Sequence, residues 1–203
     1  QYWLFYCLTF MAGARRQIFF VFAGFMMVEK FGFEVHEITA LYMINLVINI
    51  VIAPLVGKAV SNWGERRALI LEYIGLTIVF FMYGGIYWFG WGVVLASILY
   101  IIDHMFFAMA IAISTYFQKI AAAEDISASA SVSFTISHIA AVVIPAALGL
   151  VWIQYPSLVF YIGALFAILS LIAVQFIPNN PAPGNEIASR TRSKHFQNEG
   201  RVS

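Results

Sequence analysis

Charged residues are scarce in this sequence: they make up 10% of its 203 positions, against roughly a quarter in a soluble globular domain. Apolar residues make up 62%, which is more apolar surface than one soluble core can cover. Lys and Arg number eleven and Asp and Glu ten, so there is no basic excess that would favour nucleic acid as a partner. The scarcity of charge excludes an ordinary soluble domain and indicates an integral membrane protein.

Cysteine is almost absent as well. Cys7 is the single cysteine of the chain, so neither an intrachain disulfide nor a cluster of thiolate ligands for a metal ion can form. The spacing His-x-x-x-His does not occur either. We therefore expect no metal, no cofactor and no enzymatic activity. An intramembrane enzyme that uses Asp103, His104 and His138 for acid–base or metal chemistry is a less favoured alternative.

Six apolar stretches are each long enough to cross a bilayer as a helix, which takes about 20 residues. Helices are favoured because a backbone that faces lipid must satisfy its own hydrogen bonds. The sequence thus predicts an all-α membrane protein with six transmembrane helices within residues 1–177, followed by a flexible cytoplasmic tail at residues 178–203. The predicted spans are residues 3–28, 38–56, 68–88, 91–117, 129–152 and 158–177.

The basic residues indicate the orientation of the spans, because Lys and Arg accumulate in short cytoplasmic loops. Six crossings place most of them on one side and leave only Lys30 on the other. We therefore predict that both ends of the chain are cytoplasmic, in the cell membrane or inner membrane, with the lipid bilayer as a partner. The cations on the predicted cytoplasmic side are Lys58, Arg66, Arg67, Lys119, Arg190, Arg192, Lys194 and Arg201.

Several spans carry charged side chains away from the loops. A charge at the centre of a span costs roughly 2.5 to 3.5 kcal/mol on insertion scales, so such a residue is a functional candidate. Arg15 and Arg16 lie near the middle of the first span and point about 100° apart, so we expect one to pair with a neighbouring span and the other to face a pathway. Asp103 is the expected acidic partner, or else a site for a proton or solute. Glu72 is expected to pair with a loop cation.

Uncharged polar side chains form stripes on two spans. Tyr42, Asn45 and Asn49 share one face of the second span, and a Ser and Thr stripe on the fifth ends at His138. The stripes fit either a water-filled cavity or hydrogen bonding between helices. His138 is either a buried structural histidine or a group that changes charge near neutral pH. The candidate pathway residues are Arg15, Arg16, Tyr42, Asn45, Asn49, Asp103, Thr135 and His138.

The connection between the second and third spans has a pattern of glycines and basic residues. It resembles the cytoplasmic loop motif of the major facilitator superfamily, in which a Gly, an acid, a basic residue, a second Gly and a pair of basic residues recur at fixed spacing. Ser61, Asn62 and Glu65 depart from the expected acidic and basic residues. The residues that carry the resemblance are Gly57, Gly64, Arg66, Arg67 and Leu69.

The whole pattern is similar to the carboxy-terminal half of such a transporter. The resemblance implies a six-helix lobe made of two three-helix repeats of inverted topology, with a missing amino-terminal six-helix half as its partner. It also implies that the first, second, fourth and fifth spans line a central site, while the third and sixth face lipid. The chain is then expected to be a piece of a longer protein.

The expected function is secondary active transport of a small polar solute by alternating access. Arg15 or Arg16 would favour an anionic solute, Asn45 and Asn49 would offer hydrogen bonds, and Asp103 or His138 would couple transport to protons. Two alternatives stay open beside it. One is export of lipophilic or cationic compounds, in which the arginines only neutralise acidic side chains. The other is a six-span protein that works alone as a homodimer.

Overall fold

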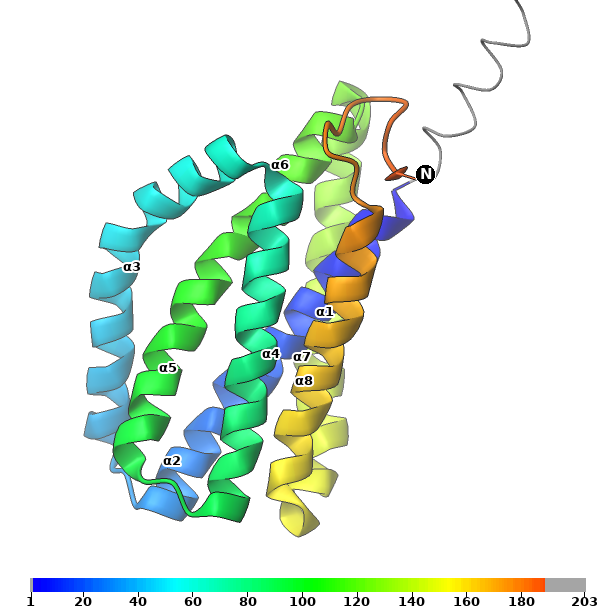
Figure 1. The fold of residues 1–203 in the computed structure, drawn as a ribbon. Helices are drawn as coiled ribbons and strands as arrows, with labels where there is room; N and C mark the ends of the chain where they lie inside the picture. The colour runs from blue at the N-terminus through cyan, green and yellow to red at the C-terminus, as the bar shows by residue number, and fades with distance from the viewer. Residues whose placement is uncertain (1, 189–203) are drawn as a thin grey trace, which may run out of the picture.

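The computed structural model describes residues 2–188, which form a bundle of helices joined by short turns (Figure 1). Six helical stretches in this part of the chain are long and apolar enough to cross a membrane. This confirms the all-α architecture with six apolar spans that the sequence predicts. The stretches are Trp3–Phe31, Val35–Trp63, Glu65–Phe89, Val93–Ile120, Ala123–Gln154 and Pro156–Phe176.

Two spans change helix type near their middle, and such turns are often found at functional sites. The first span consists of α1 (Trp3–Ile18), a π-helical turn η1 (Phe19–Ala23) and α2 (Gly24–Phe31). The fourth consists of α5 (Val93–Phe107), a 3₁₀ turn η2 (Ala108–Ala110) and α6 (Ile111–Ile120). The other elements are α3 (Val35–Trp63), α4 (Glu65–Phe89), α7 (Ala123–Gln154), α8 (Pro156–Ala173) and η3 (Val174–Phe176).

The second span is longer than the apolar pattern predicts, because α3 continues beyond Val56 to Trp63. Gly57 is therefore a helical residue, and the connection to α4 is a tight turn at Gly64, whose φ of +83° suits glycine. The extension is stabilised by packing, since the side chains of Val56 and Val60 are buried in an apolar cluster with α4 and α6.

The segment that follows the last span also differs from its prediction as a flexible tail. Pro178 and Glu186 are buried, and the hydroxyl of Tyr116 donates a hydrogen bond to the carbonyl oxygen of Glu186 at 2.6 Å. The part of the predicted tail up to residue 188 thus folds back onto α6. Residues 189–203, with their predicted cytoplasmic cations, lie outside the described residues.

The tightest helix pair is α4 with α8, which lie side by side in Figure 1. Each helix places a ring against a glycine of the other. The ring of Phe80 covers Gly163, and the ring of Tyr161 covers Gly84. Small residues let helices approach closely, and in lipid such packing is a main source of association between helices. The α4–α8 pair therefore forms the most closely packed side of the bundle.

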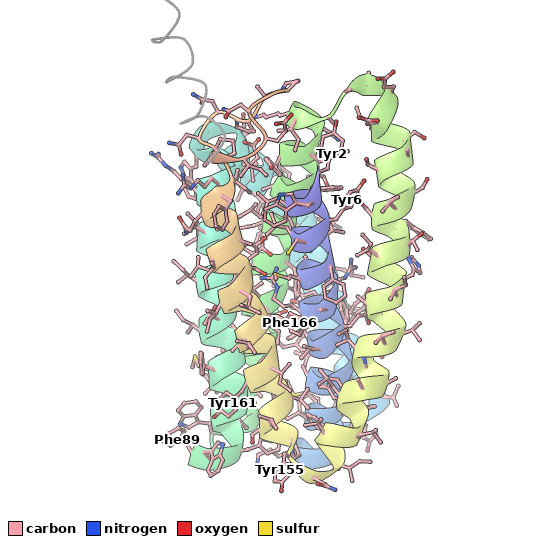
Figure 2. The ribbon with its side chains drawn as sticks, turned by 90° about the vertical axis from the view of Figure 1, so that its right-hand side faces the viewer. Tyr2, Tyr6, Phe89, Tyr155, Tyr161 and Phe166 are labelled. Carbon is pink, nitrogen blue, oxygen red and sulfur yellow. The ribbon has the colours of Figure 1, made fainter. Side chains whose placement is uncertain are left out.

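The helices α3 and α7 lie at the periphery of the bundle. In the most apolar stretch of α4, 61% of the residues are buried, against 6% in α3 and 11% in α7. Figure 1 shows α3 at one edge, and Figure 2 shows the yellow-green α7 at another. Hydrogen bonds from Tyr6 to Ser129 and from Trp152 to Glu29 fasten α7 to the first span near its two ends.

Candidate functional site

A cavity of about 610 Å³ lies among the first, second, fourth and fifth spans. None of the described residues that line it comes from α4 or α8. Its wall combines polar groups with aromatic rings. The polar residues are Thr9, Arg16, Gln17, Asn49, His104, Ser114, Ser133, Ser137 and His138, and the aromatic ones are Phe5, Phe20, Phe107 and Phe134.

Arg16 gives this cavity its positive charge. Its side chain is exposed, and its guanidinium carbon lies 5.5 Å from the centroid of the Phe20 ring. No acidic residue lines the cavity among the residues that the structure describes. A cation in a partly enclosed space with low-dielectric walls concentrates anions there. The cavity is therefore suited to a negatively charged small molecule.

Two imidazole rings also line the cavity. Nδ1 of His104 lies 3.2 Å from the carbonyl oxygen of Tyr100, and Nδ1 of His138 lies 2.8 Å from that of Phe134. A carbonyl oxygen only accepts hydrogen bonds, so each Nδ1 must carry the proton and donate it. This leaves each Nε2 as an acceptor in the neutral ring. The side chain of His138 is exposed.

The structure gives the two consecutive arginines different environments, as their angular separation predicts. Arg15 is fully buried, and its Nη2 atom lies 3.6 Å from Oε1 of Glu72. The partner predicted for it was Asp103, and the predicted partner of Glu72 was a loop cation; both predictions are wrong. The reason is the course of α1, which runs diagonally behind α4 in Figure 1 and brings Arg15 beside Glu72 of α4.

Asp103 is a second correction to the predicted pathway. Its side chain is fully buried and does not line the cavity. Both carboxylate oxygens lack a hydrogen-bond partner within the described part of the chain. The next residue, His104, turns to the cavity instead, because one helical step changes the direction of a side chain by about 100°. The position along the span predicted the correct turn of α5 for a cavity residue, but the residue of that turn that faces the cavity is His104 and not Asp103.

The other candidate residues are divided between the cavity and its surroundings. Asn49 lines the cavity, whereas the buried Asn45 lies in a narrow crevice between α3 and α5 that it shares with Asn49 and His104. Tyr42 is largely exposed, with its ring centroid 6.5 Å from that of His104. Thr135 is exposed outside the cavity and donates a hydrogen bond to a carbonyl oxygen of its own helix. Only Arg16, Asn49 and His138 of the predicted set line the cavity itself.

Several polar residues of the cavity wall were not among the sequence candidates. Ser133 and Ser137 line it from α7, one helical turn apart, and Gln17 and Ser114 line it from α1 and α6. The fifth span is rich enough in Ser and Thr to show two polar stripes, and spacing alone cannot distinguish between them. His138 belongs to the predicted stripe and lines the cavity beside Ser137, so the sequence contained no separate signal for Ser133 and Ser137.

The residues of the loop motif lie at the ends of helices and not in the cavity. Nη2 of Arg66 donates a hydrogen bond to Oε1 of Gln175 at 3.0 Å, which ties the start of α4 to the end of the last span. Nζ of Lys119 lies 2.7 Å from Oε1 of the buried Glu65. Arg67 is exposed. These contacts fasten three helix ends together on the side of the bundle where α3 turns into α4.

Comparisons with known proteins identify no relative: no protein-family model, no curated protein and no solved structure matches the chain. The resemblance to the major facilitator superfamily therefore rests on the motif residues and on the span pattern. The structure by itself supports a more general description of the fold than the family resemblance implies. Residues 2–188 form a helical bundle with six stretches that are each long and apolar enough to span a membrane.

Proposed function

We propose that this chain is one six-helix lobe of a secondary transporter of the major facilitator type, with two inverted three-helix repeats, and that it moves a small anionic solute by alternating access. The observation that carries the proposal is the position of Arg16. Its guanidinium lies in a cavity that polar and aromatic side chains line, with no acidic residue among the described residues around it. A guanidinium without an acidic neighbour in a partly enclosed cavity attracts anions, and this supports an anionic solute.

The chemistry of the cavity supports a solute of a particular kind. Its volume of about 610 Å³ falls in the range typical of small-molecule sites. Ser114, Ser133 and Ser137 offer hydroxyl groups, and Gln17 and Asn49 offer amides. The phenyl rings suit an apolar portion of the same molecule. A carboxylate with an apolar or aromatic substituent fits both parts of the wall.

The periphery of the bundle supports a partner. The helices α3 and α7 expose apolar side chains, among them Ile50 at 74% and Leu150 at 73%. Both helices also contribute to the cavity wall. An amino-terminal six-helix half packed on these two helices would cover their apolar faces and complete the enclosure of the solute. Its rocking against this lobe would open the cavity to one side of the membrane at a time.

Uptake into lipid vesicles tests the proposal. The full-length protein is reconstituted, and accumulation of a panel of radiolabelled small carboxylates is measured under an inward proton gradient. We expect saturable uptake of at least one carboxylate, lost in Arg16→Gln. The matched control is Arg67→Gln, which removes the same charge from an exposed position at the start of α4. Uptake that Arg16→Gln leaves at the wild-type rate would contradict an anionic solute.

Export of lipophilic compounds is the second candidate, and the aromatic part of the wall favours it. Four phenylalanines line the cavity, from the first, fourth and fifth spans. An exporter of this kind would protect cells from apolar or cationic toxic compounds when expressed, and Arg16→Gln would leave that protection intact. Carboxylate uptake that depends on Arg16 and absence of protection would together favour the anion transporter.

A further inference from the structure

Three charged side chains lie fully buried where α1, α4 and α5 meet, apart from the residues that line the cavity. They are Arg15, Glu72 and Asp103, and we name them the buried charge cluster. Nη2 of Arg15 lies 3.6 Å from Oε1 of Glu72, and its Cζ lies 4.4 Å from the centroid of the Tyr73 ring. Asp103 lies on α5, which packs against α4, and its side chain is fully buried as well.

The charges of this cluster do not balance when all three groups are ionised. There are one guanidinium and two carboxylates, which leaves a net negative charge in the interior of the bundle. Burying an unpaired charge is far more costly than burying a neutral polar group. The oxygens of Asp103 have no hydrogen-bond donor among the described residues to compensate such a charge. Protonation of one carboxylate makes the cluster neutral.

Within residues 2–188, the groups around the cluster supply no second buried cation. Tyrosine and cysteine are neutral at neutral pH, and Arg16 is exposed in the cavity, where water screens its charge. Nδ1–H of His104 donates a hydrogen bond to the backbone carbonyl oxygen of Tyr100, and Nε2 of the same ring is buried without a hydrogen-bond partner in the described chain. An imidazolium would bury a second N–H without an acceptor, so the neutral ring fits better. The neighbouring groups are Cys7 and Arg16 of α1, Tyr73 and Tyr83 of α4, and Tyr100 and His104 of α5.

We infer that Glu72 and Asp103 hold one proton between them opposite Arg15, so that the lobe contains an internal proton-binding site separate from the solute cavity. Glu72 lies beside Arg15, whereas the oxygens of Asp103 have no hydrogen-bond donor among the described residues, so the geometry favours Asp103 as the protonated group. The presence of the proton follows from the cluster alone. Its use as the coupling ion rests on the proposed transport function, and it would place coupling at Glu72 and Asp103 instead of His138.

Infrared spectroscopy of the protein in lipid vesicles tests the inference without any solute. At neutral pH a buried protonated carboxyl group gives a C=O band at higher frequency than ionised carboxylates. We expect this band in the wild type. Glu72→Gln and Asp103→Asn should each abolish it, because the remaining carboxylate then balances Arg15. In Arg15→Gln both carboxyl groups should be protonated, and the band should grow.

The control is Glu65→Gln, which removes another buried carboxylate, one that pairs with Lys119. It should leave the band unchanged. A wild type without the band, or a band that persists in both Glu72→Gln and Asp103→Asn, would overturn the inference. If a variant does not fold, ¹³C labelling of the aspartate or glutamate carboxyl groups in the wild type decides the matter, since the band must shift with one label or both.

This readout separates the inference from the proposed function. If the protein shows the band but transports no carboxylate, the proton site is supported and the transporter proposal is wrong. If the protein shows no band but transports a carboxylate in a way that depends on Arg16, the transporter proposal is supported and the proton site is wrong. In a transporting protein with the band, Glu72→Gln and Asp103→Asn should also abolish accumulation driven by the proton gradient, while exchange of solute across the membrane continues.

Discussion

Arg15 and Arg16 are adjacent in the chain and have opposite surroundings. Arg15 is enclosed by protein and interacts with Glu72 and the ring of Tyr73, whereas Arg16 is exposed in the cavity. Removing one member of a buried ion pair typically costs about 3–5 kcal/mol, because the other charge is left without compensation. Arg15 therefore contributes to the stability of the fold as well as to the charge balance of the buried cluster. Arg16 has no acidic partner among the described residues that line the cavity, and its charge is available for the proposed anionic solute.

A prediction at this scale concerns the potential that Arg16 creates. In a full-length background from which Cys7 and any other cysteine have been removed, Ser137→Cys places a thiol in the wall of the cavity that Arg16 also lines. Anionic thiol reagents should react with it faster than cationic ones, and Arg16→Gln should lower this ratio by a factor on the order of 10. The measurement is the labelling rate with the two reagents in lipid vesicles.

The control for this measurement is Val142→Cys on the same helix. Val142 is 70% exposed and lies outside the cavity wall, so its thiol should react slowly with both charged reagents. Equal rates for the anionic and cationic reagents at Ser137→Cys would show that Arg16 does not set the potential of the cavity.

At the scale of elements, the helices divide into a tightly packed pair and a looser set. The α4–α8 pair is held by rings against glycines and carries none of the described cavity residues. The cavity spans contain the irregular features: the π turn η1, the 3₁₀ turn η2, Pro54 in α3 and Pro145 in α7. The closely packed α4–α8 pair can therefore act as a scaffold for the less regular helices that line the cavity.

A substitution in the α4–α8 contact should destabilise the bundle. A Cβ atom added at Gly163 would lie 2.7 Å from ring atoms of Phe80, whose side chain is fully buried and has no room to move. We expect Gly163→Ala to lower the free energy of unfolding by about 1–3 kcal/mol, which is typical of overpacking. Thermal unfolding in detergent measures the effect.

The matched variant is Gly149→Ala in α7, where an added Cβ has no heavy atom within 4 Å. It should leave the unfolding temperature unchanged or raise it, because alanine favours the helix more than glycine does. An equal loss in the two variants would mean that close packing of α4 on α8 is not the cause.

At the scale of the whole molecule, the two ends of the described chain lie at the same end of the bundle in Figure 1. This follows from an even number of crossings. The turn between α3 and α4 lies at that end too, and the turn between α2 and α3, with Lys30, lies at the opposite end. The excess of Lys and Arg near the first end predicts that this end is cytoplasmic.

Thiol labelling of intact cells checks this orientation. In the same cysteine-free background, Val35→Cys at the exposed start of α3 should react with a membrane-impermeant maleimide in intact cells. Ser61→Cys, near the exposed end of the same helix, should react only after the membrane is permeabilised. The reverse pattern would mean that the lobe has the opposite orientation.

Apolar run length and charge scarcity determined the all-α architecture and the six long apolar helices, because a backbone in lipid has few ways to satisfy its hydrogen bonds. The separate environments of Arg15 and Arg16 followed from the angle between consecutive residues. Tertiary structure alone decided that Glu72 is the partner of Arg15 and that His104, not Asp103, faces the cavity. The physical reason is that the tilt and rotation of each helix depend on its neighbours, through contacts such as Phe80 on Gly163 that join residues far apart in the chain.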